Sequence, residues 1–297
     1  MSFVQENFAD LLEPGLRKIF ADVFNRQESM LSVLFNMQSS DKAVEHDLEM
    51  GDMANLEPFE GTIPYDDSGE GYKVDYTHLE YARGIKIERR LVINDLYNII
   101  NRRPAALALS AFRRREADGA SLFNNSFGSA GFLGGDGLGL CNSAHTSRNG
   151  GANQSNVGTD ALSAVAVETA RQLMIAFKSN RDNIITIKPT MLIVPHQLEE
   201  KAYEIINSKG KVDTAQNNAN FHQGKYSLVV WPNYLTAVTK WWMVDAELMK
   251  MFLLWFDREP VQFFKDRDFD SLQAKFAAYG YYSFGFSDWR WVLGENA

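Results

Sequence analysis

The feature that most constrains the fold is the order in which four kinds of segment follow one another along the 297 residues. A polar N-terminal arm is followed by an acidic stretch that glycine and proline punctuate. An arginine-rich helical segment comes next and ends at the glycine-rich run from Gly128 to Gly139. The chain closes on an aromatic, strand-like tail that ends in Ser287-Asp288-Trp289-Arg290. An arm and an excursion bury little apolar surface by themselves, so both need a surface to dock on.

Composition limits the classes of protein that the chain can belong to. With 45% hydrophobic residues it can bury one or two ordinary cores. A formal net charge of -8 argues against a protein whose main task is to neutralise phosphates. The single cysteine, Cys141, excludes an intrachain disulfide and fits a reducing compartment, where we expect it to be an inert thiol. We find no signal peptide pattern and no apolar window long enough to span a bilayer.

The N-terminal arm and the acidic stretch each have a distinct pattern. The arm carries apolar residues at helical spacing, which predict short amphipathic helices: Phe8, Leu11, Leu12, Leu16, Ile19, Phe20 and Phe24. These helices dock on their own domain or on a neighbouring subunit, and we expect them to serve the neighbour more. The run from Asp41 to Glu70 is acidic, and the residues after it alternate like a strand. It predicts a protruding two-stranded loop or, alternatively, a solvated acidic loop with no partner.

The middle of the chain predicts a strand and a long helix. Ile85 and Ile87 alternate with charged residues as in a half-buried strand, and Asn94-Asp95 offers an N-cap for a helix. Pro104 either kinks this helix or opens a second one. Three consecutive arginines, Arg113 to Arg115, follow its apolar stripe, and we expect the helix to end near Phe127.

The rest of the chain predicts a second globular unit of the α/β type. We expect residues 128–139 and 142–156 to be a flexible, polar separation between the two units. A helix from Asp160, a buried strand over Thr190 to Pro195 and a second helix follow. Ser208 to Gln223 is a polar loop, and strands are expected at 227–231 and 240–244. The aromatic tail from Phe252 to Val292 is strand-like.

The chain shows no sequence signature of catalysis or of a cofactor. It contains no Walker-type phosphate loop, no GxSxG, no HExxH and no CxxC. The five histidines are far apart in the sequence, so nothing in it supports a metal site. The run Gly134 to Gly139 has the wrong spacing for a phosphate cradle and follows a helix, so we interpret it as a hinge. We therefore expect no cofactor and no enzymatic activity.

Several segments, in their order, resemble a known family. Phe112-Arg113 through Phe127, the exit Gly134 to Leu140, and Ala144-His145 followed by Gly150 to Asn156 look like the corresponding stretch of Mu-like major head subunits. Leu192-Ile193-Val194-Pro195 is similar too, and Arg258-Glu259-Pro260 and Asp288-Trp289-Arg290 are similar to the tails of many tailed-phage major capsid proteins. The likeness covers residues 80 to 297 well and the arm loosely.

This resemblance implies an α+β chain with the Hong Kong ninety-seven phage capsid fold. The parts of that fold are an N-terminal arm, an extended E-loop, a P-domain with a long spine helix and a β-sheet, and an α/β A-domain. On this chain the resemblance places the arm at residues 1–48, the E-loop at 49–83 and the P-domain at 84–127. The A-domain is then 128–251, and residues 252–297 return to the P-domain.

The function implied is that of a major capsid protein, which assembles with itself into hexamers and pentamers of an icosahedral shell around phage double-stranded DNA. Scaffold, portal and decoration proteins are further partners, and packaged DNA is contacted only weakly at the inner face. The shell is assembled in the host bacterial cytoplasm and becomes part of the virion. An encapsulin-like nanocompartment shell with the same fold is the alternative, and an α/β enzyme of another kind is a distant third. Some members of the family form a Lys–Asn cross-link, but no asparagine and glutamate could be aligned for Lys73, so we expect a non-covalent shell.

Three sets of residues are candidates for contacts between subunits in such a shell. The acidic run and the arginines of the long helix are complementary in charge, so we expect ion pairs between an E-loop and a neighbouring P-domain. The E-loop candidates are Asp66, Asp67, Glu70 and Lys73. The spine-helix candidates are Arg102, Arg103, Arg113, Arg114 and Arg115. The candidates for the loop at the capsomer axis are Lys209, Lys211, Asp213 and Gln216.

Overall fold

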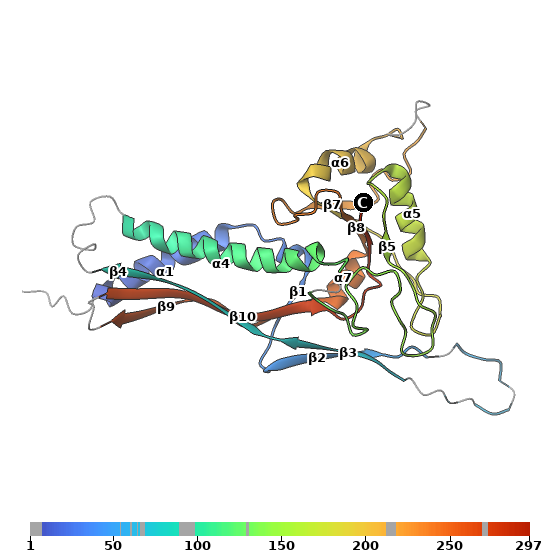
Figure 1. Ribbon diagram of the computed structural model, residues 1–297, viewed down its shortest axis with the longest axis horizontal. Helices are drawn as coiled ribbons and strands as arrows, with labels where there is room; N and C mark the ends of the chain where they lie inside the picture. The colour runs from blue at the N-terminus through green and yellow to red at the C-terminus, as the bar shows by residue number, and fades with distance from the viewer. Residues whose placement is uncertain are drawn as a thin grey trace, which may run out of the picture.

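A computed structural model describes residues 8–53, 55–59, 61–63, 65, 69–88, 99–128, 131–211, 218–268 and 273–297. Figure 1 shows three parts: a long sheet with two helices along it, a globular unit at one end, and a two-stranded hairpin on the side away from the helices. The mixture of helices and sheets confirms the predicted α+β class.

The long sheet has four strands in the order β1 (Asn36–Ser39), β9 (Leu253–Asp268), β10 (Gln273–Phe286) and β4 (Leu79–Glu88). β9 and β10 form an antiparallel hairpin, and β1 pairs parallel to β9. Side chains of β10 alternate between buried and half-buried positions, because one face of the sheet packs against helices. The strand-like aromatic tail and the strand at residues 85–87 are thereby confirmed.

Two helices, α1 (Phe8–Arg26) and α4 (Ile99–Asn124), cover that face. α4 continues through Pro104 as one helix, with Leu107 buried in the next turn. It ends at Asn124, close to the predicted end near Phe127. The proposed N-cap at Asn94-Asp95 lies outside the described residues.

The expectation that the arm serves a neighbour more than its own subunit is wrong for the described part. Leu16 and Phe20 of α1 are buried against Phe263 of β9 and Ile100 of α4. The short helix α2 (Leu31–Leu34) then contributes Leu31 and Leu34 to the core, and β1 pairs with β9 in the long sheet. The apolar stripe of α1 therefore packs within its own subunit, against the helix side of the long sheet.

The globular unit contains a second sheet, in the order β5 (Val157–Gly158), β11 (Val292–Glu295), β8 (Trp241–Val244), β6 (Met191–Val194) and β7 (Ser227–Val230). Its helices are α5 (Ala164–Ile175), α6 (Glu199–Asn207) with the one-turn η2 (His196–Leu198) before it, and α7 (Ala246–Phe252). Ser163 caps α5 through its side chain, which accepts from the Ala166 amide. The predicted α/β unit is confirmed.

The last strand corrects one part of the predicted division. Residues 252–297 were all expected to return to the first unit, but β11 pairs with β8 and β5 of the second sheet. Every side chain of β11 is buried there. β5 and β8 pair along its two edges, so β11 is an inner strand of the second sheet.

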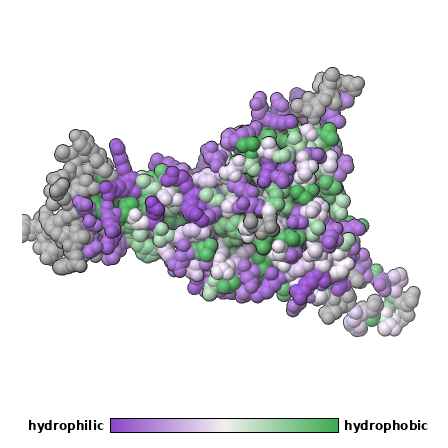
Figure 2. Space-filling model, viewed as in Figure 1, coloured by the Kyte–Doolittle hydropathy of each residue, from purple (hydrophilic) through white to green (hydrophobic). Residues whose placement is uncertain are grey.

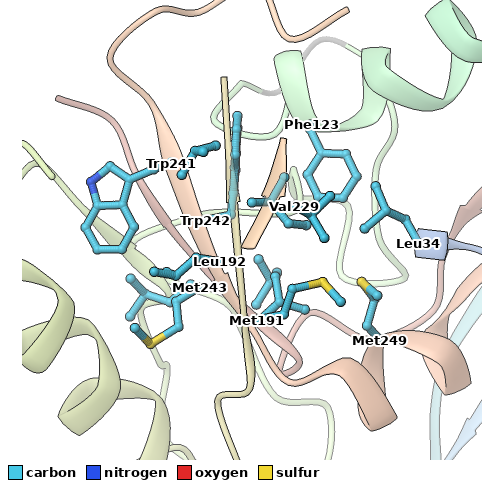
Figure 3. Close-up of a cluster of buried hydrophobic side chains, with 14 of the residues drawn as sticks. Leu34, Phe123, Met191, Leu192, Val229, Trp241, Trp242, Met243 and Met249 are labelled. Carbon is cyan, nitrogen blue, oxygen red and sulfur yellow. The ribbon is translucent and has the colours of Figure 1, made fainter. Parts of the chain in front are cut away.

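One hydrophobic core joins the two units. Trp242 of β8 lies on the same side of the second sheet as Phe123 of α4, with 5.6 Å between ring centroids, and Trp241 points to the other side (Figure 3). Leu34 of α2 belongs to this core as well. Gly119 allows α4 to pack this closely, because a Cβ at that position would clash with Leu31. The two units therefore cannot separate without exposing a shared core.

The polar segments between the units are packed, so the predicted flexible separation is wrong. The buried ring of His145 contacts Asp136 through Nδ1 at 2.6 Å and Asn156 through Nε2 at 3.1 Å. The same ring stacks on Trp289 with 4.4 Å between centroids. A Cβ at Gly135 would clash with Tyr72, so this glycine allows a close approach of two segments and is not a hinge.

The hairpin consists of β2 (Val44–Met50) and β3 (Glu70–Thr77), which pair antiparallel. This confirms the predicted two-stranded loop. Its first strand begins within the segment that was assigned to the arm, five residues before position 49.

Candidate functional site

The distal part of the β2–β3 hairpin exposes large apolar side chains. The exposed fraction is 102% for Leu56, 93% for Tyr65, 73% for Phe59, 61% for Ile63 and 58% for Met53. Figure 2 shows this end of the hairpin standing apart from the body of the subunit. Apolar side chains gathered on a projecting segment are typical of a protein–protein contact. From the sequence we predicted an acidic, protruding loop and no apolar contact surface; the apolar residues spaced through 53–65 were the available signal.

The four hairpin candidates divide between described and undescribed residues. Glu70 and Lys73 are exposed on β3. Lys73 Nζ lies 3.0 Å from Asp75 Oδ1, and the His46 ring contacts the same oxygen at 2.6 Å. The hydrogen bond from His46, followed by that from Lys73, lowers the pKa of Asp75. Asp66 and Asp67 lie outside the described residues.

The five arginines of α4 have different surroundings. Arg115 forms a bidentate pair with Asp257 at 2.9 and 3.0 Å, and only 12% of its side chain is exposed. Arg114 pairs with Asp118 at 2.7 Å. Arg103 donates to the Lys86 carbonyl at 2.6 Å. Arg102 and Arg113 have exposed side chains, so they are the members of the set best placed to meet another subunit.

The loop after α6 is closed at its base by a short backbone pairing. Gly210 bridges Ala219, and the Lys211 amide donates to the Asn218 carbonyl at 2.7 Å. The Asn220 side chain donates to the Ile205 and Ser208 carbonyls and so ties the base to α6. Lys209 and Lys211 are exposed, while Asp213 and Gln216 lie outside the described residues.

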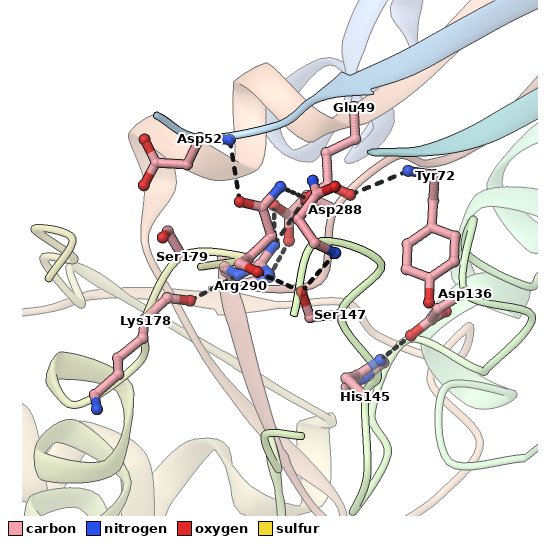
Figure 4. A network of polar contacts seen from close by, with 12 residues as sticks. Glu49, Asp52, Tyr72, Asp136, His145, Ser147, Lys178, Ser179, Asp288 and Arg290 are labelled. Carbon is pink, nitrogen blue, oxygen red and sulfur yellow. Dashed lines mark hydrogen bonds and ion pairs between the residues drawn. The ribbon is translucent and has the colours of Figure 1, made fainter. Parts of the chain in front are cut away.

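A polar junction attaches the hairpin to the globular unit, and we define it by Glu49, Asp52, Asn180, Asp288 and Arg290 (Figure 4). The Asp52 amide donates to Asn180 Oδ1 at 3.1 Å. Arg290 Nη1 lies 3.4 Å from Glu49 Oε1 and 2.7 Å from Asp288 Oδ2. Two carboxylates therefore share one guanidinium nitrogen.

Two further contacts support the junction from the neighbouring segments. The Tyr72 hydroxyl lies 2.8 Å from Thr146 Oγ1, and Arg148 Nη1 donates to the Gly71 carbonyl at 3.0 Å. Burial raises the pKa of Glu49, and the Asp288 carboxylate raises it further, while Arg290 opposes both. Nothing in the sequence indicated this junction, because it joins three segments that are far apart along the chain, with a separation of 241 positions from Glu49 to Arg290.

Three further features of the chain concern metal binding, the reactivity of the thiol and membrane spans. Among the described residues there is no group of three or more His, Cys, Asp or Glu side chains that could hold a metal ion. Burial raises the pKa of Cys141 to about 12, which keeps the thiol protonated. None of the helices in the described part of the chain is long and apolar enough to cross a membrane. The features that stand out are surfaces for contact with other molecules.

Comparison with known proteins identifies the family. The model of a family described as phage capsid protein matches residues 71–293, which is most of the chain. The protein therefore belongs to the phage capsid protein family. A search of curated proteins found no relative of this chain.

Solved structures support the same fold. The capsid of a native GTA particle matches with a TM-score of 0.61 and 12% identity, over 92% of this chain and 91% of that chain. The bacteriophage JBD30 capsid decorated with minor capsid protein trimers matches with a TM-score of 0.59 and 13% identity, over 79% of this chain and 100% of that one. A virus-like particle from Pyrococcus furiosus matches with a TM-score of 0.54 and 11% identity, over 95% of this chain and 98% of that one. These likenesses establish the tailed-phage capsid fold that the sequence predicted.

Proposed function

We propose that this capsid protein assembles into hexamers and pentamers and forms the icosahedral head that encloses phage double-stranded DNA. Membership of the phage capsid protein family supports the proposal. The observation that carries it is the projecting hairpin, whose side chains at positions 56, 59 and 65 are 102%, 73% and 93% exposed. Apolar surface of this extent is stabilised only when another subunit covers it.

The parts of the chain divide the work of assembly in this proposal. The E-loop, centred on the β2–β3 hairpin, reaches over a neighbour. The P-domain, formed by the long sheet with α1 and α4, receives it. The A-domain, formed by the second sheet and its helices, surrounds the capsomer axis, with the loop that begins at Lys209 and Lys211 nearest to it. The last strand, β11, belongs to the A-domain sheet by its pairing.

Contacts between the E-loop and the neighbouring P-domain combine apolar burial with charge. The groove between α1, α4 and β9 has a volume of about 760 Å³ and is lined by Phe20, Phe24, Phe112 and Arg17 among others. It offers the apolar side chains of a neighbouring E-loop a place to dock. Asp66, Asp67 and Glu70 then face Arg102 and Arg113 of the neighbour. Arg115 stays with Asp257 of its own subunit.

The shell has partners beyond itself in this proposal. Scaffold and portal proteins act during assembly in the host cytoplasm, and the finished protein is part of the virion. The JBD30 capsid carries minor capsid protein trimers, which makes decoration a further possibility to test here. A net charge of -8 allows only weak, local contact with packaged DNA. The subunit catalyses no reaction.

Electron microscopy of the purified protein, together with light scattering, tests this function. We expect closed shells or rings of five and six subunits. A compact monomer across concentration and salt would contradict the proposal. Closed shells that copurify with an enzyme from the same gene neighbourhood would favour a nanocompartment.

A further inference from the structure

The junction between the hairpin and the globular unit contains one carboxylate more than its guanidinium needs. Asp288 lies two residues from Arg290, accepts from its Nη1 at 2.7 Å and also accepts from its amide at 2.8 Å. This pair forms within one loop, whether or not the hairpin is docked. Glu49 comes from β2 and reaches the same Nη1 at 3.4 Å. Docking therefore brings a second negative charge to a pair that is already neutral.

The other contacts of Glu49 compensate only weakly for the hydration that its carboxylate loses when the hairpin docks. Asn180 Nδ2 lies 3.4 Å from Oε1, and the Tyr72 amide lies 3.3 Å from Oε2. Both distances exceed the usual range for a hydrogen bond to a charged oxygen. The adjoining cavity has a volume of about 20 Å³. It holds one water at most, and only 21% of the Glu49 side chain is exposed, so the ionised carboxylate is less hydrated in the docked state than in water.

The contacts that hold the hairpin in place do not involve the charge of Glu49. Asn183 Nδ2 donates to Asp52 Oδ2 at 2.7 Å, and the Asp52 amide donates to Asn180. Arg148 and Tyr72 supply the contacts described above. The charged groups that face Glu49 directly are those of Asp288 and Arg290. Asp52 and Arg148 lie on the neighbouring segments of the junction. Asp136, which contacts His145, lines the same small cavity as Glu49.

We propose that Glu49 opposes the docking of the hairpin base. The hairpin of each subunit is then held by its other hydrogen bonds, those of Asp52, Tyr72 and Arg148, against an electrostatic repulsion that depends on whether Glu49 is protonated. The inference concerns a contact within one subunit and rests on the proposed function only for its consequence in a shell. There, a weakly held base lets the hairpin adjust its angle when a neighbour covers its apolar end.

The pH dependence follows from the raised pKa of Glu49. A carboxylate that binds its proton more tightly when docked than when released stabilises the docked state as pH falls through the raised value. Neutral and alkaline conditions favour release. A glutamine at position 49 removes the charge and keeps one acceptor oxygen for Arg290 and Asn180, while its NH2 group cannot accept the long hydrogen bond from the Tyr72 amide. Docking of this variant no longer depends on the titration of position 49.

Hydrogen exchange of the unassembled full-length protein tests the proposal. Mass spectrometry follows the amides of β2, of β3 and of Asp52 at pH 5.5 and pH 7.5, with each rate divided by the chemical exchange rate at that pH. The variants are Glu49→Gln and Asp288→Asn, and Asp41→Asn, which removes an exposed charge before the other end of β2, is the matched control. Amides of α5 report on global stability in the same experiment.

We expect Glu49→Gln to slow exchange at the hairpin base about threefold at pH 7.5, the size of effect typical of one partly buried charge, and to change it less at pH 5.5. Asp288→Asn slows it too, because Arg290 then serves Glu49 alone, and Asp41→Asn changes nothing. Equal or faster exchange in Glu49→Gln would overturn the proposal. If Glu49→Gln also speeds exchange in α5, the variant has lost global stability, and the test then depends on Asp288→Asn. Equal or faster exchange at the hairpin base in Asp288→Asn would overturn the proposal. Absence of shells in the electron microscope would overturn the proposed function and leave this result unaffected.

Discussion

Two phenylalanines distinguish the part of the chain that folds the subunit from the part that joins subunits. Phe20 of α1 is 4% exposed, and its ring lies 5.2 Å from that of Phe263 and 6.0 Å from that of Phe24. Phe59, on the distal hairpin, is 73% exposed. We expect Phe20→Ala to destabilise the fold and Phe59→Ala to weaken assembly, although the chemical change is the same.

The magnitude for Phe20 follows from its burial and from the groove that it lines. Truncation of a buried phenylalanine to alanine costs about 3–5 kcal/mol, because apolar contacts are lost and a cavity remains. Phe20 borders the groove of about 760 Å³, where the neighbours relax and water enters. We therefore expect the lower end, about 3 kcal/mol of unfolding free energy. Phe59→Ala changes an exposed side chain and stays within about 0.5 kcal/mol.

Urea unfolding of dilute, unassembled protein measures the first effect, and light scattering under assembly conditions measures the second. Phe59→Ala is the control in the unfolding measurement, because it makes the same chemical change on an exposed side chain. Equal stability of Phe20→Ala and the parent would refute the conclusion that the N-terminal segment is part of the subunit core. Assembly of Phe59→Ala with the parent's yield and salt resistance would refute the role given to the apolar end of the hairpin.

Three further predictions concern the arm, a buried carboxylate and the charges of the E-loop. Deleting residues 1–48 unfolds the protein, because they supply β1 and the buried Phe35; a monodisperse, folded truncation in circular dichroism and gel filtration would contradict this. Burial raises the pKa of Glu295 to about 6, so the native state binds this proton more tightly than the unfolded chain, and the ionised form costs stability above that pH. A glutamine there raises Tm at pH 8 and leaves it unchanged at pH 5; equal shifts in scanning fluorimetry would count against this account. Exposed ion pairs contribute about 0–1 kcal/mol each, so only several reversals together weaken shells at low salt. We expect lysine at positions 66, 67 and 70 together to lower shell stability at low salt, measured by light scattering. Adding Arg102→Glu and Arg113→Glu to this variant partly restores that stability. Shells of the lysine variant as stable as the parent's would exclude the ionic contact.

The sequence alone determined the elements whose pattern is local. Alternation in the aromatic tail predicted β10, and the run Met191–Val194 predicted a buried strand before α6. The acidic stretch, followed by an alternating segment, predicted the hairpin. The order of these segments was enough to indicate the capsid fold, because each part of that fold has its own composition.

Only the tertiary structure decided which surfaces are already occupied within one subunit. The sequence showed an amphipathic arm. Its docking depends on a sheet face to which β9 and β10, more than two hundred positions away, contribute most of the buried residues. It also showed three consecutive arginines, and the pairing of Arg115 with Asp257 depends on where β9 lies beside α4. The junction of Glu49 with Arg290 has the same origin. Periodicity in the sequence indicates which face of a helix or strand is apolar or charged. Which element packs against that face depends on contacts between residues far apart in the chain, and the local sequence does not determine these.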